Sequence, residues 1–177
     1  MLKKIGIGVA ALIALLLVVV SMQPATYRVE RKVTIQAGSG AVYKHLDDLR
    51  AWAEWSPWDK IDPGMKRTFQ GPQSGVGAIY EWSGNDEVGK GRMTITEVTE
   101  PTQVRIKLEF IEPFASVAQT EFALAESGAE TVVTWSMAGD NDFMGKAFSL
   151  VMDMDAMIGA DFEKGLATLK STVEAGR

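Results

Sequence analysis

From residue 27 to residue 137 most of the chain alternates between apolar and polar positions with a period of two, the spacing of strands that bury one face. Between residues 103 and 111, Val104, Ile106, Leu108 and Phe110 share one side while Arg105, Lys107 and Glu109 share the other. Breaks that contain Gly or Pro separate these segments. The pattern predicts an antiparallel sheet with one buried face, built from strands at residues 27–35, 66–70, 78–83, 91–98, 103–111, 116–125 and 130–137.

Two other stretches follow the 3.6-residue period of a helix. Residues 41–52 place Val42, Leu46 and Leu49 on one side, and the Ser56-Pro57 pair ends any helix there. Residues 142–174 read as one long amphipathic helix. Its apolar face contains Phe148, Val151, Met152, Ile158, Phe162, Leu166, Leu169 and Val173, with Asp155 near the middle of that face. Strand, helix, six strands and long helix make an α+β order with helices on one face of the sheet.

Residues 1–22 form a separate unit. Lys3 and Lys4 precede an uncharged apolar run, residues 5–20, which is at the short end of what a spanning helix needs. A signal peptide has the same layout but a shorter apolar core and a small-residue cleavage site, and only a weak candidate site is present here. We therefore expect an uncleaved single-pass anchor over residues 5–22, with the domain on the extracytoplasmic side. The alternative is a secreted or periplasmic protein after signal cleavage. Residues 23–26 read as a linker and residues 27–175 as the domain.

Composition narrows the function. The chain has 177 residues, enough for one domain with a substantial core. Its formal charge is −5, and without the two lysines of the anchor the remainder has 16 basic and 23 acidic residues. Such an acidic domain is a poor partner for nucleic acid or for an anionic lipid surface. Cysteine is absent, so disulfides and thiolate chemistry are excluded.

Two features are candidates for a site. Trp52, Trp55 and Trp58 fall within seven residues and predict either a core plug that closes one end of the sheet or an aromatic rim around a pocket. Asp155, on the apolar face of the last helix, needs a partner if it is buried. It is either a hydrogen-bonded structural acid, or a polar anchor for a ligand or a general acid/base with a raised pKa.

Other motifs favour ordinary structural roles. His45 lies near Asp47 and Asp48 but has no nucleophile motif to serve, and no cluster has the spacing of metal ligands. We therefore predict no metal and no cofactor. The Gly139-Asp140-Asn141-Asp142 stretch lacks the remaining positions of a calcium loop and is better interpreted as a helix cap.

Several motifs resemble the SRPBCC superfamily (START-like, helix-grip), and within it the bacterial polyketide cyclase/dehydrase and lipid transport group. They are the Trp55-Ser56-Pro57-Trp58 motif, Tyr80-x-Trp82-x-Gly84-Asn85 with Gly89-x-Gly91-x-Met93-x-Ile95, and a C-terminal pattern from Met154 to Lys170. The resemblance covers residues 27–175. It implies a seven-stranded antiparallel sheet curved around the C-terminal helix, with a hydrophobic tunnel between them.

The resemblance also implies a tunnel wall. Carried onto this chain, that wall comprises Trp82, Met93, Ile95, Ile106, Leu108, Phe110, Phe122, Trp135 and Met137 from the sheet, and Phe148, Met152, Asp155 and Phe162 from the helix. Members of the superfamily bind lipids, sterols, polyketides or hormones, and only some are enzymes. We therefore expect a membrane-tethered, non-enzymatic domain that binds a hydrophobic small molecule or lipid. The alternatives are a cyclase/dehydratase that uses Asp155 as acid/base, and a filled-core interaction module.

Overall fold

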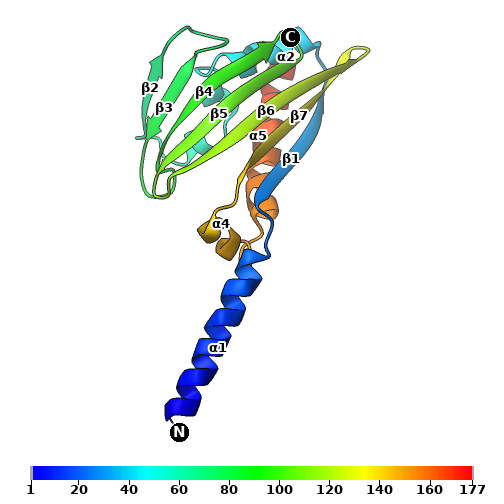
Figure 1. The fold of residues 1–177 in the computed structure, drawn as a ribbon. Coiled ribbons are helices and arrows are strands. Elements are labelled where there is room, and N and C mark those ends of the chain that lie inside the picture. The colour runs from blue at the N-terminus through cyan, green and yellow to red at the C-terminus, as the bar shows by residue number, and fades with distance from the viewer. Residues whose placement is uncertain (1, 177) are drawn as a thin grey trace.

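The computed structural model describes residues 2–176, and its centre is one antiparallel sheet of seven strands (Figure 1). The spatial order is β1-β7-β6-β5-β4-β3-β2, so all neighbours except β1 and β7 are consecutive in sequence. This confirms the predicted α+β class and the seven-stranded antiparallel sheet. The strands are β1 (Thr26–Ile35), β2 (Lys66–Gln70), β3 (Ile79–Ser83), β4 (Lys90–Thr99), β5 (Gln103–Glu112), β6 (Ser116–Ser127) and β7 (Glu130–Asp140).

Alternation along the strands decides which face is buried. In β6, Ala118, Thr120 and Phe122 are buried, whereas the residues between them are less so. Phe122 lies opposite Trp135 of β7, and their rings stack with centroids 4.9 Å apart. Because the period of two is kept across neighbouring strands, the large side chains collect on the concave face of the sheet.

The segment between β1 and β2 closes one end of the concave face. It contains α2 (Ser39–Asp47), α3 (Trp52–Trp55) and a single 3₁₀ turn, η1 (Trp58–Lys60). The predicted helix over residues 41–52 is therefore wrong in its second half, because the chain leaves the helix at Asp48. The carboxylate of Asp48 accepts a hydrogen bond from the Arg50 backbone N–H at 2.9 Å, a local turn that competes with helix.

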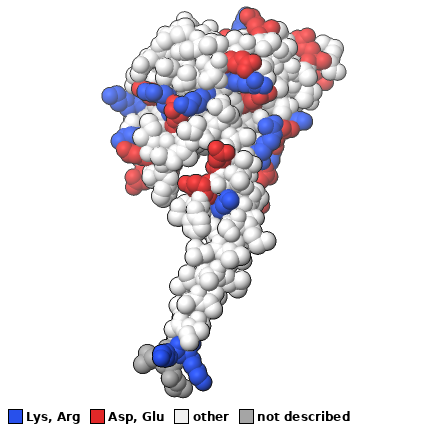
Figure 2. Space-filling view, viewed as in Figure 1, with Lys and Arg blue, Asp and Glu red and all other residues white. Residues whose placement is uncertain are grey.

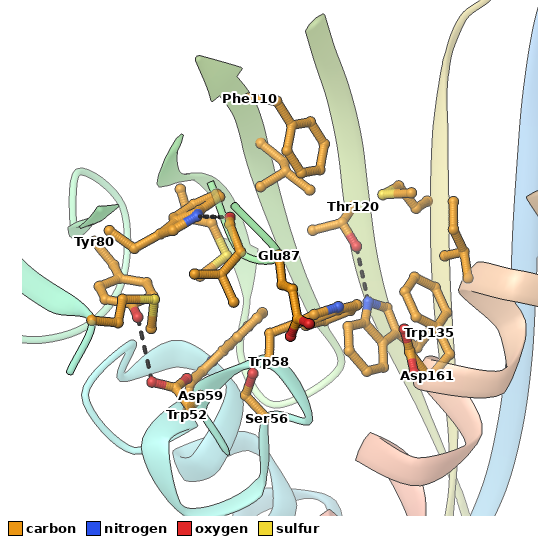
Figure 3. Close-up of a pocket in the computed structure, with 18 of the residues that line it drawn as sticks. Trp52, Ser56, Trp58, Asp59, Tyr80, Glu87, Phe110, Thr120, Trp135 and Asp161 are labelled. Carbon is orange, nitrogen blue, oxygen red and sulfur yellow. Dashed lines mark hydrogen bonds between the residues drawn. The ribbon is translucent and has the colours of Figure 1, made fainter. Parts of the chain in front are cut away.

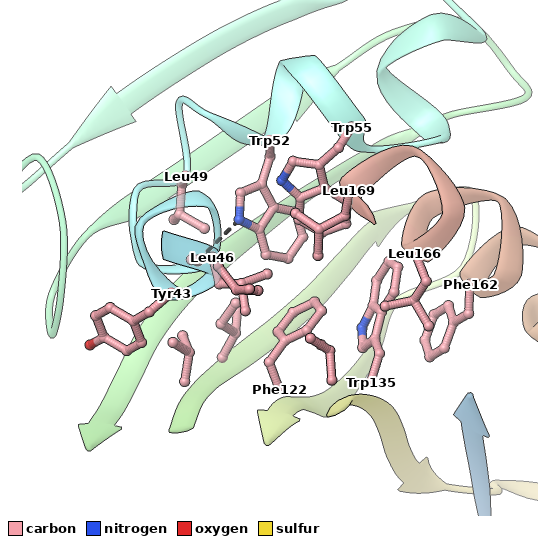
Figure 4. Close-up of a cluster of buried hydrophobic side chains, with 14 of the residues drawn as sticks. Tyr43, Leu46, Leu49, Trp52, Trp55, Phe122, Trp135, Phe162, Leu166 and Leu169 are labelled. Atoms are coloured by element: carbon pink, nitrogen blue, oxygen red, sulfur yellow. Dashed lines mark hydrogen bonds between the residues drawn. The ribbon is translucent and has the colours of Figure 1, made fainter. Parts of the chain in front are cut away.

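The C-terminal helix α5 (Met154–Ala175) lies along the concave face and packs mainly on β1 and α3. Phe162, Leu166, Leu169 and Val173 are its buried apolar residues, and they meet Trp135 and Phe122 in the core (Figure 4). Close approach is possible at Gly165, where a Cβ would press on the Trp135 ring and on Pro57.

The expected single helix over residues 142–174 is two helices, α4 (Phe143–Phe148) and α5, with a break at residues 149–153. Each has its own N-cap: Asp142 accepts a hydrogen bond from the Gly145 N–H at 2.7 Å, and Asp153 accepts one from the Ala156 N–H at 2.9 Å. The predicted cap at Gly139–Asp142 is therefore confirmed. The second cap was missed, and it restarts the helix in a new direction.

The N-terminal helix α1 (Leu2–Ser21) projects from the domain, and its apolar side chains are largely exposed (Figure 1). Within the described residues it is the one helix long and apolar enough to cross a membrane or to be a signal sequence, over Lys3–Ser21. Its C-terminal end contacts α4.

Candidate functional site

The tryptophan segment positions the site. The indole N–H of Trp52 donates to the Leu46 carbonyl at 3.1 Å, and that of Trp55 donates to the His45 carbonyl at 3.0 Å, which fixes α3 against α2. Both indoles are buried, and Trp55 packs edge-on against Trp135 with ring centroids 5.5 Å apart (Figure 4). The core-plug interpretation therefore holds for Trp55 and, in part, for Trp52, which is buried but also reaches the wall of a cavity.

Beside this plug lies a cavity of about 330 Å³ between the concave sheet, η1 and the first half of α5 (Figure 3). Its size is at the lower end of the roughly 300–1,000 Å³ of ligand pockets. Its wall is mostly apolar, and Trp58 lines it from η1, so this third tryptophan is part of a pocket. The lining residues are Trp52, Ser56, Trp58, Asp59, Met65, Tyr80, Trp82, Glu87, Val88, Met93, Leu108, Phe110, Thr120, Trp135, Met137, Met157, Ile158, Asp161 and Phe162.

Trp135 forms the rigid side of the cavity. Its ring is parallel to that of Phe162, with centroids 3.9 Å apart, so sheet and α5 meet through stacked aromatic rings. The indole N–H donates to the Thr120 Oγ1 at 2.9 Å, and the Thr120 hydroxyl donates to the Ser136 carbonyl at 2.9 Å. These two hydrogen bonds satisfy the polar side-chain atoms of Trp135 and Thr120, which are otherwise buried among apolar groups.

The opposite side of the cavity contains Trp82. Its ring lies over Gly91 of the neighbouring strand, where any Cβ would overlap it. Its indole N–H donates to the Val88 carbonyl at 2.9 Å, and its ring meets Phe110 edge-on with centroids 6.2 Å apart. The glycine thus gives the indole room to lie flat, and the hydrogen bond holds it there.

A polar corner interrupts the apolar wall next to η1. The Arg67 Nε donates to the Asp59 Oδ1 at 2.6 Å, and the Tyr80 hydroxyl lies 3.4 Å from the same oxygen (Figure 3). Only 7% of the Asp59 side chain is exposed. Among residues 2–176, no side-chain hydrogen bond reaches the Asp59 Oδ2 or the Ser56 Oγ. Both oxygens are therefore available to a donor group inside the cavity.

Burial, followed by the charge of Asp59, raises the pKa of Tyr80 to about 12. The phenol is therefore protonated at neutral pH. The hydrogen bond with Asp59 raises the pKa of Arg67 as well. The corner thus presents a fixed ion pair and a neutral hydroxyl to the cavity.

Of the thirteen residues expected in the tunnel wall, seven lie in the lining of this cavity. They are Trp82, Met93, Leu108, Phe110, Trp135, Met137 and Phe162. Ile95, Ile106 and Phe122 are fully buried in the core but are not in the lining. Phe148 and Met152 are exposed by 40% and 44%, because the break between α4 and α5 turns this stretch away from the sheet.

The placement of Asp155 inside the tunnel is wrong. Its side chain is 58% exposed and lies outside the cavity, where its Oδ2 is 3.0 Å from Nη2 of Arg31 on β1. The same guanidinium contacts Glu163 at 2.8 Å. The hydrogen bond from Arg31 lowers the pKa of Asp155, the opposite of what a general acid in an apolar tunnel would need. The acid belongs to an ion-pair network that fastens β1 to α5.

Periodicity did not point to several residues of the cavity. Asp59 and Ser56 flank the Pro57-Trp58 pair, and that proximity was the one available signal for them. Asp161 contacts Lys164 at 3.0 Å and also lines the cavity. His45 lies outside the cavity, with its Nδ1 3.8 Å from Glu54, and residues 2–176 contain no group of three or more His, Cys, Asp or Glu placed to hold a metal.

Comparisons with known proteins agree with this architecture. A sequence model of the family described as "Polyketide cyclase / dehydrase and lipid transport" matches residues 26–174. Protein CV1439 from Chromobacterium violaceum is similar in structure at 18% identity, with a TM-score of 0.59 over 85% of this chain and 98% of that one. No curated protein matches the chain.

Two further solved structures are similar. The Aha1 protein from Colwellia psychrerythraea, a dimer, has 16% identity and a TM-score of 0.61 over 85% of this chain and 98% of its own. The di-domain ARO/CYC protein BexL of the BE-7585A biosynthetic pathway has 14% identity and a TM-score of 0.64, and the match covers 88% of this chain but 52% of BexL. At these identities the likeness shows the fold alone.

Proposed function

Since the chain belongs to the polyketide cyclase/dehydrase and lipid transport family, of SRPBCC type, we propose that it is a membrane-tethered binding domain for a hydrophobic small molecule or lipid. The observation that carries this proposal is the apolar cavity of about 330 Å³ between the sheet and α5. A filled-core module would have no such space. The cavity is small, so its ligand is a compact apolar molecule or one chain of a larger lipid.

The polar corner gives the ligand an orientation. The apolar body would lie against Trp82, Leu108 and Trp135, and a hydroxyl or amine of the ligand would donate to the free oxygens of Asp59 and Ser56. Apolar burial would supply most of the affinity, at about 25 cal/mol per Å². A few fixed polar groups in a largely apolar wall are typical of small-molecule sites.

A non-enzymatic role fits the state of the acids. Asp59 is in an ion pair with Arg67, and Asp155 is paired with Arg31 outside the cavity. Each is held in a structural contact. These two ion pairs favour a ligand that is carried or sensed over one that is converted.

Tethering by α1 is the second part of the proposal. The helix has 20 residues and so a length of about 30 Å, the thickness of the hydrocarbon core of a bilayer. Lys3 and Lys4 lie at its N-terminal end, and the positive-inside tendency favours the cytoplasm for that end. The domain would then lie on the extracytoplasmic side.

The test uses the tryptophans themselves. Four of the five in the chain line the cavity, so a bound polyene with a hydroxyl head group, such as cis-parinaryl alcohol, accepts energy from them. The full chain in phosphatidylcholine nanodiscs should show saturable energy transfer. The double variant Leu108→Phe/Met137→Phe, which narrows the cavity and adds no tryptophan, should lose it.

Val76→Phe is the matched control, because Val76 is 56% exposed in the β2–β3 loop. It should bind the probe like the wild type. Equal energy transfer in the wild type and the narrowed variant would mean that the probe reports only the bilayer, and the binding function would be refuted. Intact-mass measurement of the protein from cells decides separately whether α1 is retained.

A further inference from the structure

The end of the domain nearest α1 has an unusual surface. Phe114, Val151 and Met144 are exposed by 70%, 80% and 56%, and Phe143, Phe148 and Met152 are also exposed. The rings of Phe114 and Phe148 lie 6.3 Å apart, so the β5–β6 turn and α4 form one continuous patch. We call these six residues the apolar collar. Contiguous exposed apolar patches mark sites of contact with a protein or a membrane.

Charge is scarce in the two segments that form the collar. Residues 143–152 include one charged side chain, Lys146, and residues 111–117 include one, Glu112, which is paired with Lys90 at 2.7 Å. Figure 2 shows most of the length of α1 as uncharged surface, with basic groups at its far end and a few acidic and basic groups where it meets the domain. Asp142 and Asp153 flank residues 143–152, so a lipid surface without net charge suits this end better than an anionic one.

The chain holds this end close to α1. Residues 22–25 connect α1 to β1, a reach of at most about 14 Å. Asn141, which lies between the end of β7 and the N-cap of α4, fastens this linker, because its backbone N–H donates to the Ala25 carbonyl at 2.8 Å and its side chain donates to the Pro24 carbonyl at 3.3 Å. With α1 across the membrane, the collar must lie at the bilayer surface.

The cavity reaches the surface at the same end. Strand order places the β3–β4 and β5–β6 turns, the end of β7 and the start of α5 together there (Figure 1). Met157 lines the cavity although 49% of it is exposed, and Glu87 of the β3–β4 turn lines the other side of the opening. Phe110 lines the cavity four residues before the collar residue Phe114. The opening thus lies beside the collar.

We propose that the apolar collar inserts into the interface of the bilayer that α1 crosses, so that the cavity exchanges its ligand directly with that leaflet. The partner is a zwitterionic lipid surface. This inference rests on the proposed tether and binding function. To the binding function it adds a route for the ligand, which passes from the lipid leaflet into the cavity without crossing water.

The docking test exploits the absence of cysteine from the chain. The single variants Phe114→Cys, Val151→Cys and Val76→Cys are each labelled with a polarity-sensitive fluorophore in the full chain, reconstituted in phosphatidylcholine vesicles. The labels at 114 and 151 should shift to the blue and be quenched by brominated lipid, whereas a label at Val76, on the opposite end of the domain, should not. Labels at 114 and 151 that behave like the one at 76 would overturn the proposal. A blue shift without quenching by brominated lipid would indicate a cover of protein, a second copy included, and would overturn it as well.

The route is tested by Phe114→Glu/Val151→Glu, with Val76→Glu as control. Both collar positions are exposed, so the domain should keep its fold, as circular dichroism checks. Losing the burial of two apolar side chains should slow uptake of cis-parinaryl alcohol from vesicles by about tenfold or more. Uptake of the same probe from cyclodextrin should reach the wild-type level of occupancy. Uptake from vesicles at the wild-type rate would overturn the proposed route.

These outcomes separate the two proposals. If brominated lipid quenches the collar labels but the protein never takes up the probe, the binding function is refuted and the membrane docking stands. If the protein binds the probe saturably but the collar labels stay exposed to water, the docking is refuted and the binding function stands.

Discussion

Replacing Thr120 by valine leaves the indole N–H of Trp135 without a partner in the middle of the domain. The Thr120 hydroxyl accepts that N–H at 2.9 Å and donates to the Ser136 carbonyl, and both side chains are almost completely buried, at 4% and 2% exposure. Valine has nearly the shape of threonine, so no cavity is created. The substitution therefore removes both hydrogen bonds and leaves one buried donor, the indole N–H, without a partner while the packing is kept.

The expected cost is about 1–3 kcal/mol, the desolvation penalty of a buried polar group that has lost its partner. For a domain of this size it corresponds to a fall in Tm of about 2–12 °C. Thr120→Ser keeps the hydroxyl and should lose less. Thr94→Val, a partly buried strand position, should stay within about 0.5 kcal/mol of the wild type.

Urea unfolding of residues 26–177, followed by tryptophan fluorescence, gives the free energies. The sharper form is a double-mutant cycle with Trp135→Phe, which removes the donor as well. In the Trp135→Phe variant, Thr120→Val leaves no indole N–H without a partner. The free-energy changes of the two substitutions should therefore differ from additivity by about 1–2 kcal/mol. If the free-energy changes of the two substitutions add within about 0.5 kcal/mol, the hydrogen bond does not stabilise this wall of the cavity.

Three other outcomes are expected. Burial and a nearby carboxylate raise the pKa of Tyr80 to about 12. The contribution of the phenol to stability is therefore complete below the unfolded pKa of about 10 and is lost as the pH rises through about 12. In alkaline unfolding titrations the free energy of unfolding of the wild type should fall by about 1–2 kcal/mol more than that of Tyr80→Phe over this range, and coincident curves would contradict this. Asp155→Asn should leave probe binding unchanged at neutral pH, and a clear loss of binding would show that this acid belongs to the site. Because the pKa of Asp155 is lowered, any stability that its carboxylate adds should be lost only as the pH falls below about 4. Gly165→Val should destabilise by about 1–3 kcal/mol, because its side chain meets the Trp135 ring, while the exposed Ala167→Val should be nearly neutral in the same urea assay.

Most of the fold could be predicted from the sequence because its strands keep a strict period of two. The range 66–70 agrees with β2 in both bounds, and β3, β5 and β6 begin within one residue of their predicted starts. Errors occur where a short polar side chain competes with the helix. Asp48 turns the chain after α2, and Asp153 caps a second helix where one was expected. Such local hydrogen bonds interrupt a helix without disturbing the apolar periodicity on which the prediction relied.

The start of α5 at Met154 also explains why Asp155 was wrongly placed inside the cavity. Asp155 shares a helical face with Phe162, which lies seven residues further along α5, but the prediction also required this face to pack on the sheet along its whole length. In the structure α5 begins at Met154, so Asp155 is in its first turn, outside the sheet, where Arg31 can reach it. The acid that faces the cavity, Asp59, comes from a 3₁₀ turn with no periodicity, and its partners Arg67 and Tyr80 come from two strands. Sequence spacing predicts which residues share one face of one element, whereas this polar corner depends on how three elements meet, and only the packed sheet brings them together.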